Sequence, residues 1–236
     1  MHSSRKEQKK AGPIPRADLA EAISLENERA ELLGNVKVTR QDWLDAAMDI
    51  FIHSGVGDVK ILTLSDKLNV SRSSFYWYFS NRKDLLDALL EYWEETNTKA
   101  LLRAAEAPAN SIAQAVCNVF CGFIDPAQFD TKLDFAVKDW ARRSEDVKKV
   151  HTRSDNARLH ALQKMFMRFD YEETDALVRA RILYYMQLGY NDAELNEPME
   201  DRLALIPHYI LGFTGKKGDE TVLEDFREFV KQLGIS

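Results

Sequence analysis

A run of aromatic residues behind a polar start, Val70-Ser71-Arg72-Ser73-Ser74-Phe75-Tyr76-Trp77-Tyr78-Phe79, constrains this chain more than any other feature. The pattern predicts a short helix in which Ser71 is the N-cap and its hydroxyl accepts from the free backbone N–H groups that follow. At 100° per residue, Phe75 and Phe79 share one face and Trp77 points the opposite way. Because large apolar side chains are usually buried, an outward Trp77 indicates a surface that something outside the protein covers.

The residues before this run predict two more helices. Residues 61–68 have a helical pattern and lead through a tight turn at Asn69-Val70 into the aromatic helix. Two short helices joined by so brief a turn are typical of a helix-turn-helix, whose second helix enters the major groove of DNA. Upstream, Thr39-Arg40-Gln41-Asp42 forms a capping box that opens a further helix, and Gly55 ends it. The three helices predict a compact head that binds DNA.

Three motifs in this region carry a resemblance to a known family: Phe51-x-x-x-Gly55, Thr63-Leu64-x-x-Lys67-Leu68-x-Val70-Ser71, and Ser74-Phe75-Tyr76-Trp77-Tyr78-Phe79-Ser80-Asn81-Arg82-Lys83-Asp84-Leu85-Leu86. Through them, residues 38–90 resemble the DNA-binding domain of the TetR (tetracycline-repressor) family of bacterial transcriptional regulators. Leu64-Ser65 stands where family members usually carry Ile-Ala, and Arg82 stands where a lysine is usual. Both departures are mild substitutions.

The helical patterns and the resemblance together imply an all-α protein. A three-helix DNA-binding head, residues 38–83, is joined by a long helix at 81–104 to a helical ligand-binding and dimerisation domain within residues 84–236. The chain is then expected to be a homodimeric repressor, released from a palindromic operator in double-stranded DNA by a small hydrophobic or amphipathic effector. The residues expected to contact DNA lie on or beside the aromatic helix: Thr63, Arg72, Ser73, Ser74, Tyr76, Trp77, Tyr78 and Arg82.

Beyond the long helix, apolar periodicity predicts only helices, because no strand-period run of useful length is present. They are expected near 112–124, 131–143, 145–169, 172–190, 199–212 and 221–233. Ser111-x-x-Gln114 and Thr221-x-x-Glu224 predict capping boxes at two of the starts.

The resemblance places the dimer face on the helices at 172–190 and 199–212. Its predicted residues are Ile182, Tyr185, Met186, Gly189, Leu205, Tyr209 and Phe213. Aromatic, sulfur-containing and polar residues on the body helices are candidates for the ligand pocket. These candidates are Phe120, Cys121, Asp139, Trp140, Arg143, His160, Phe166, Tyr184 and Gln187. Residues of these types at helical spacing equally fill a core, and that alternative stays open for both sets.

Charge is distributed unevenly along the chain. The formal net charge is −6, yet residues 35–83 hold seven Lys/Arg and five Asp, whereas residues 84–236 hold nineteen basic and twenty-seven acidic residues. A mildly basic head on an acidic body is oriented toward a polyanion. Candidate phosphate contacts are Lys60, Lys67, Arg72, Arg82 and Lys83. The alternative is that these are ordinary solvated charges.

Residues 1–37 combine a basic tail with an extra helical stretch from about residue 16 to 33. The tail either follows a DNA groove as a flexible arm or is solvated. The start does not resemble a signal peptide, and no apolar run approaches the about 20 residues that cross a bilayer, so a cytoplasmic protein without membrane contact is expected.

Enzyme motifs are missing from the sequence. Cys117 and Cys121 lie one helical turn apart without a second Cys or His pair, so no metal site is expected, and no cofactor is implied. The two thiols are expected to be core residues, with a thiol-reactive sensor as the alternative. Gly212-Phe213-Thr214-Gly215-Lys216-Lys217 lacks the spacing of a phosphate loop. The chain is therefore not expected to be an enzyme. The competing hypothesis is a helical small-molecule carrier or enzyme with a vestigial helix-turn-helix.

Overall fold

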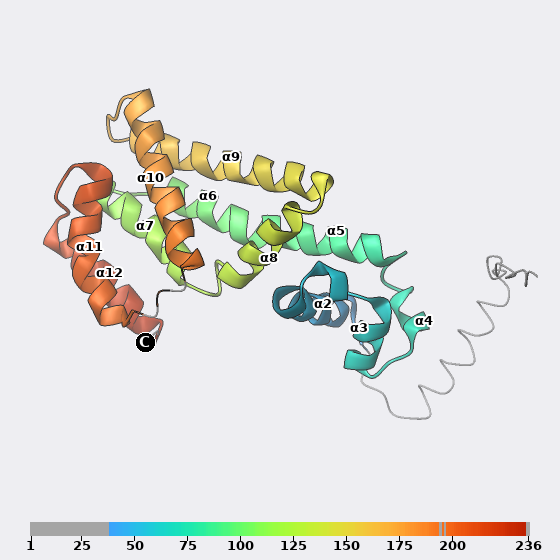
Figure 1. Cartoon of the computed structure of the whole chain (residues 1–236). Coiled ribbons are helices and arrows are strands. Elements are labelled where there is room, and N and C mark those ends of the chain that lie inside the picture. The colour runs from blue at the N-terminus through green and yellow to red at the C-terminus, as the bar shows by residue number, and fades with distance from the viewer. Residues whose placement is uncertain (1–37, 194, 196, 235–236) are drawn as a thin grey trace, which may run out of the picture.

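The computed structural model describes residues 38–193, 195 and 197–234, so the predicted tail and extra helix at 1–37 lie outside the described residues. Every regular element of the described part is helical, as the sequence predicts (Figure 1). The head consists of α2 (Arg40–Ser54), a 3₁₀ turn at Val56–Asp58, α3 (Ile61–Leu68) and α4 (Arg72–Phe75).

Local side-chain bonds set the first helix boundary as predicted. The Thr39 hydroxyl accepts from the Asp42 N–H at 3.2 Å, and the Asp42 carboxylate accepts from the Thr39 N–H at 2.6 Å, which completes the capping box. At the other end, Gly55 has φ 80° and its N–H donates to the Phe51 carbonyl. A side chain at that φ would be strained, so glycine is suited to end α2 there.

A single rod connects the head to the rest of the chain. It comprises α5 (Arg82–Trp93), a π-helical turn at Glu94–Thr98 and α6 (Lys99–Glu106) (Figure 1). The Asn81 side chain caps its start by accepting from the Asp84 N–H at 3.1 Å. The predicted long helix is therefore confirmed, with a π turn in its middle that the apolar periodicity did not indicate.

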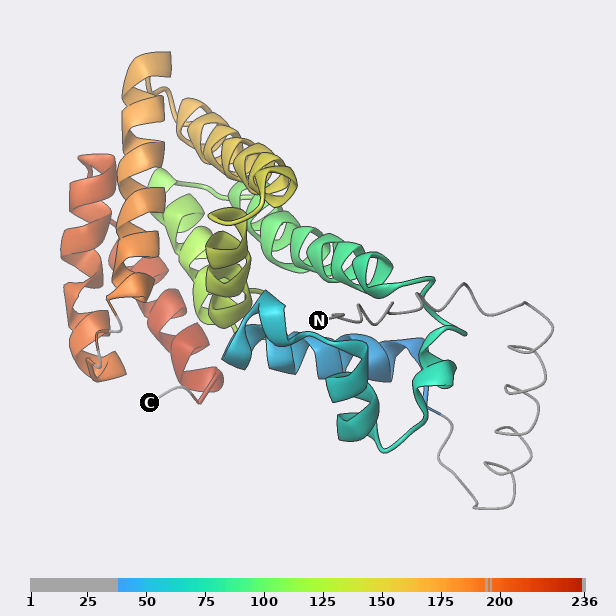
Figure 2. The same cartoon turned by 45° about the vertical axis from the view of Figure 1, so that its right-hand side comes forward.

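The remaining helices form the body. They are α7 (Ile112–Ile124), α8 (Thr131–Ala141), α9 (Glu145–Met167), α10 (Glu173–Asp192), α11 (Met199–Thr214) and α12 (Glu220–Gln232). Figure 1 shows α11 and α12 on the side of the body opposite the head, and Figure 2 shows α10 running beside α11. The capping box predicted at Thr221 is wrong, because α12 begins at Glu220 after Asp219 and has no side-chain cap. At Ser111 only half of the box forms, since the Gln114 side chain accepts from the Asn110 N–H instead.

Two apolar cores hold the described residues together. The head core is built around Trp43, Phe51, Phe75 and Phe79, and it also takes in side chains from α5 and α8. The second core lies among α6, α7 and α9 to α12. The packing of α8 against α2 gives the body a second contact with the head beside the rod.

A buried ionic network lies where the π turn meets the body. The Arg158 guanidinium, on α9 and fully buried, donates to both carboxylate oxygens of Asp134 on α8, with the shorter contact at 2.9 Å. It also donates to the Thr98 hydroxyl at 3.1 Å and the Tyr184 hydroxyl at 3.3 Å. One side chain therefore joins the π turn to α8, α9 and α10.

Candidate DNA interface and ligand pocket

The aromatic helix is held in place by its inward-facing rings. Phe75 and Phe79 are 0% and 1% exposed, and their rings stack with centroids 5.4 Å apart. Trp43 of α2 meets Phe75 edge-on at 5.3 Å. The preceding turn depends on Asn69, which has φ 54° and ψ 44°, a left-handed conformation that asparagine tolerates better than most residues. The predicted helix-turn-helix and its buried face are confirmed.

The opposite side of this segment is open to solvent. Tyr76 is 53% exposed. Trp77 is 59% exposed, which is the highest value among the large apolar side chains in the described part of the chain. Arg72 and Thr63 are exposed beside them, while Ser73 and Ser74 are half-buried. These six predicted DNA contacts therefore lie on α3 or on the segment from α4 to residue 77, and α3 packs against α4.

The details of the segment differ from the prediction at two points. Regular helix ends at Phe75, and residues 76–78 continue as a turn in which the Phe79 N–H still donates to the Phe75 carbonyl. This continuation preserves the predicted outward direction of Trp77. Ser71 is the N-cap residue, but its hydroxyl contacts the Ser73 hydroxyl at 2.8 Å and caps no backbone N–H.

Two predicted DNA contacts are engaged inside the head. The Tyr78 hydroxyl donates to the Val38 carbonyl at 2.7 Å. The Arg82 guanidinium donates from Nε to the Val59 carbonyl at 2.5 Å and from a terminal nitrogen to the Val56 carbonyl. The Arg82 bonds hold the start of α5 against the 3₁₀ turn, and the Tyr78 bond holds the aromatic segment against Val38, just before α2, so both side chains help to position the head.

Most of the candidate phosphate-binding cations are paired with acids. Lys60, Lys67 and Lys83 lie 2.9, 2.6 and 2.6 Å from the carboxylates of Asp58, Asp49 and Asp87. All three pairs are solvent-exposed, and such pairs contribute little to stability because water and salt screen them, so a phosphate can compete for the cation. Arg72 forms no ion pair with any described residue.

The predicted dimer residues divide by burial. On α10, the predicted residues Ile182 and Tyr185 are 50% and 53% exposed, Gly189 is also exposed, and Val178, which was not predicted, is 48% exposed. Their spacing of four, three and four residues places them on one helical stripe. On α11, the predicted residue Leu205 is 42% exposed, and Leu211, which was not predicted, is 40% exposed. Of the other predicted residues, Met186 and Tyr209 are half-buried and Phe213 is buried in the core.

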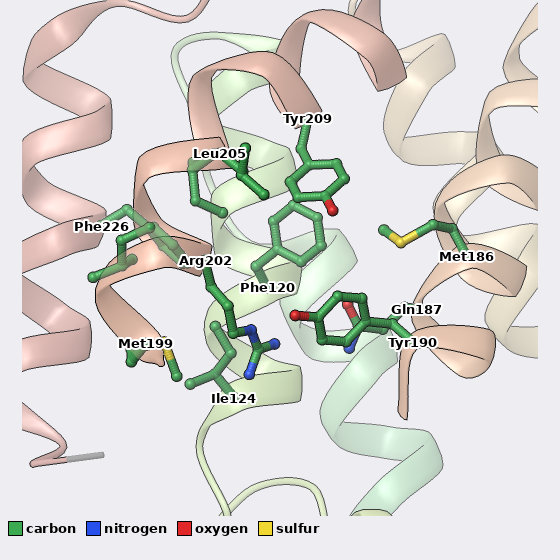
Figure 3. Close-up of a pocket in the computed structure, with 12 residues that line it drawn as sticks. Phe120, Ile124, Met186, Gln187, Tyr190, Met199, Arg202, Leu205, Tyr209 and Phe226 are labelled. Atoms are coloured by element: carbon green, nitrogen blue, oxygen red, sulfur yellow. The ribbon is translucent and has the colours of Figure 1, made fainter. Parts of the chain in front are cut away.

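An apolar pocket opens between α7, α10, α11 and α12, with a cavity volume of about 40 Å³ (Figure 3). That volume accommodates only a few water molecules, so a larger ligand must displace side chains at its mouth. Of the nine predicted pocket residues, Phe120 and Gln187 line it. Sequence reasoning missed Tyr190 and Arg202, although an arginine in the same α11 face as Met199 and Ile206 was an available signal.

The other seven predicted pocket residues lie elsewhere. Asp139, Trp140 and Arg143 line a wide groove of about 710 Å³ between α8 and the C-terminal end of α2. Tyr184 belongs to the buried ionic network, and Phe166 packs edge-on against Tyr171 in the core. His160 is exposed on α9, and Cys121 is half-buried on α7 without lining the pocket. The nine predicted pocket residues therefore do not form one site, because they lie in separate parts of the core and of the surface.

The two thiols lie within or against the body core. Burial raises the pKa of Cys117 to about 12, and burial likewise raises the pKa of Cys121 to about 11. The reactive thiolate is therefore scarce near neutral pH, which favours the packing role over the sensor. Within the described residues, no three His, Cys, Asp or Glu side chains gather as metal ligands. In the same part of the chain, no helix has the length and apolarity to cross a bilayer.

Comparison with known proteins agrees with this geometry. Residues 44–89 match the family model described as "Bacterial regulatory proteins, tetR family". Over 54 residues the chain is 37% identical to "Uncharacterized HTH-type transcriptional regulator TtgW" of Pseudomonas putida. The aligned residues make up 23% of this chain and 40% of that protein. Over 69 residues it is 33% identical to the transcriptional regulator TtgR of the same species, covering 29% and 32%. The chain thus spans less than half the length of these relatives.

Solved structures extend the likeness to the whole fold. The chain superposes on AmtR of Mycobacterium smegmatis with a TM-score of 0.56 at 17% identity, covering 85% of this chain and 96% of AmtR. GusR of Salmonella enterica gives a TM-score of 0.51 at 16% identity, covering 82% and 90%. Taken together, these findings show a tetR-family helix-turn-helix head at residues 44–89, in a chain that has the all-α fold of these solved structures.

Proposed function

We propose that the chain is a homodimeric transcriptional repressor that a small hydrophobic or amphipathic effector releases from a palindromic operator. The observation that carries the proposal is the pairing of a solvent-exposed Trp77 and Tyr76 with buried Phe75 and Phe79 on the same short segment. The buried rings fix the backbone, so the exposed rings are presented rigidly for a partner. The family match of the head supports double-stranded DNA as that partner, and it agrees with a non-enzymatic role.

In this proposal, residues 38–83 are the DNA-binding domain and residues 84–236 contain the effector and dimer surfaces. Thr63, Arg72, Ser73, Ser74, Tyr76 and Trp77 contact bases and phosphates directly. We propose that Tyr78 and Arg82 act at one remove, since their polar atoms bind carbonyls of the head.

A dimer follows from the reading mode. One short helix contacts too little DNA for a specific site, whereas two heads read half-sites about 34–36 Å apart. The apolar stripe of Val178, Ile182, Tyr185 and Gly189 on α10, beside α11, supports a four-helix contact between two copies. Phe213, which was also predicted for that contact, is buried in the core of its own subunit. It therefore packs behind the exposed residues and does not touch the second copy.

The effector would act through the packing between body and head. The apolar pocket borders α10, which packs along α9, and α9 contacts α8, which in turn packs on α2. We propose that an effector moving α10 shifts α8 and the rod, and so changes the separation of the two heads. For this to release DNA, the effector must bind the released state more tightly than the DNA-bound state.

The test measures binding of the purified chain to DNA from upstream of its own gene by fluorescence anisotropy. Wild type is expected to bind as a dimer, with affinity falling about 10³- to 10⁵-fold between 50 and 200 mM salt if about 6–10 phosphates are contacted. Ile182→Arg places a charge in the proposed dimer stripe, so it is expected to sediment as a monomer and lose this binding.

Met167→Arg is the matched control, because Met167 is an exposed apolar residue on α9, outside the stripe. It is expected to bind DNA like wild type. An Ile182→Arg protein that stays dimeric would contradict the proposed contact. Wild-type binding that is weak and insensitive to salt would instead favour the alternative of a helical carrier or enzyme with a vestigial helix-turn-helix.

A further inference from the structure

Among the described residues, one cation lines the apolar pocket. The polar groups of the lining are Gln187 of α10, Arg202 of α11 and the hydroxyls of Tyr190 and Tyr209, and the other lining side chains are apolar. Figure 3 shows the Arg202 side chain extending from α11 into the pocket, between Ile124 and Tyr190. Its guanidinium carbon lies 4.6 Å from the centroid of the Tyr190 ring.

This arginine lacks an acidic partner in the described part of the chain. None of the described carboxylates lies within 4.0 Å of its nitrogens, in contrast to Arg158, Arg179 and Arg227, which are all paired. Glu197 is close by, but its carboxylate accepts from the Tyr190 hydroxyl. A half-buried guanidinium held only over an aromatic ring keeps most of its five N–H donors available.

We propose that Arg202 binds the anionic head of the effector, and that the effector is an amphipathic organic carboxylate. This inference rests on the proposed effector pocket and adds the chemical class of its ligand. A planar guanidinium matches a carboxylate through two parallel N–H···O bonds. Phe120, Ile206 and Phe226 then pack against the apolar body of the ligand.

Entry of such a ligand requires the mouth of the pocket to widen. Leu205 is 42% exposed, whereas Tyr209 is half-buried with its ring stacked on Phe213 at 6.0 Å, so widening the mouth displaces α11 side chains that take part in the proposed dimer contact. Arg202, Leu205 and Tyr209 all lie on α11, one helix of the proposed dimer contact. A carboxylate that pulls on Arg202 therefore acts directly on the element that joins the two copies.

The experiment measures the dissociation constants of hexanoate, decanoate and 4-phenylbutyrate, and of the corresponding neutral alcohols, by isothermal titration calorimetry on the full-length chain. The variant Arg202→Met removes the charge and keeps an apolar side chain, and Arg202→Lys keeps the charge. Arg181→Met, at an exposed arginine of α10 outside the pocket, is the control. Circular dichroism verifies that each variant is folded.

At least one carboxylate is expected to bind wild type more tightly than its alcohol. Arg202→Met should weaken that carboxylate about 10- to 100-fold, the worth of a hydrogen-bonded charge, and leave the alcohol unchanged. Arg202→Lys should recover part of the loss, and Arg181→Met should bind like wild type. Equal binding of carboxylate and alcohol, equal binding by wild type and Arg202→Met, or no binding of any carboxylate would overturn the proposal.

A parallel anisotropy measurement separates this inference from the proposed function. If a carboxylate binds through Arg202 but leaves the DNA complex intact, the ligand class holds and effector-induced release fails. If the chain binds no DNA, the regulator proposal fails, while the calorimetry still decides the ligand class.

Discussion

The variant Trp77→Ala is expected to lose specific DNA binding and to keep the stability of wild type. The Trp77 side chain is 59% exposed, so its removal creates no cavity, and the free energy of unfolding should change by no more than about 0.5 kcal/mol. In the complex, the same ring would be buried against the duplex, where Trp is among the residues that contribute most to binding. We expect a loss of at least about 2 kcal/mol of binding free energy, roughly 30-fold in affinity.

Two further substitutions make this result specific. Phe75→Ala, two residues away, removes a fully buried ring and is expected to destabilise the head by about 3–5 kcal/mol. Tyr92→Ala removes an exposed ring from α5, outside the proposed interface, and should change neither property. Urea denaturation and anisotropy on the same preparations measure both quantities. If Trp77→Ala lost stability, or bound DNA like wild type, the proposal that this side chain faces outward and contacts DNA would be contradicted.

The variant Asp134→Ala is expected to cost about 3–5 kcal/mol of folding free energy, because it leaves the Arg158 guanidinium buried without its counter-charge. Asp134 also accepts from the Trp93 indole N–H at 2.7 Å, which would lose its partner as well. Replacing both charged residues, as in Asp134→Ala with Arg158→Met, is expected to cost less than the sum of the single changes. Chemical denaturation of the four proteins measures this coupling.

The same pair gives a pH dependence of defined sign. Burial alone would raise the pKa of Asp134. The positive charge of Arg158 and the hydrogen bonds from Arg158, Trp93 and Asn97 outweigh burial and hold the pKa below its ordinary value. A depressed folded-state pKa stabilises the protein above the unfolded pKa of about 3.9, and this stabilisation is lost as the pH falls through the folded pKa. In Asp134→Ala, the free energy of unfolding should therefore fall less steeply than in wild type as the pH is lowered below about 4. If the losses of folding free energy in the two single variants added up to that of the double variant, and the pH dependence of stability were unchanged in Asp134→Ala, the pair would not be coupled.

Much of the fold could be predicted because its signals are local. The ranges 61–68 and 112–124 are confirmed to the residue, and the predicted cap at Thr39 uses a partner three residues away. The outward Trp77 and inward Phe75 follow from helical geometry alone. Local motifs still fail where another bond competes, as at Ser71, whose hydroxyl contacts that of Ser73.

The site residues could be predicted only in part, because pockets are formed by residues far apart in the chain. Arg158 belongs to a helix that is mostly polar by sequence, and its burial depends on Asp134, 24 residues earlier, and Thr98, 60 residues earlier. Likewise, Arg202 and Phe120 line one pocket only because α11 packs beside α7. Periodicity gives the buried face of each helix, and it does not give the neighbour of that face.

The most direct test of the central claim is protection of guanine N7 from methylation in the DNA upstream of this chain's gene. N7 faces the major groove, so a protein that inserts the Trp77 segment there shields it. We expect two protected half-sites related by two-fold symmetry, with centres about 10–10.5 base pairs apart or a multiple of that spacing, and no protection by Trp77→Ala. A single unsymmetrical patch, or protection that Trp77→Ala retains, would contradict the claim that this exposed aromatic surface reads DNA as one of a pair.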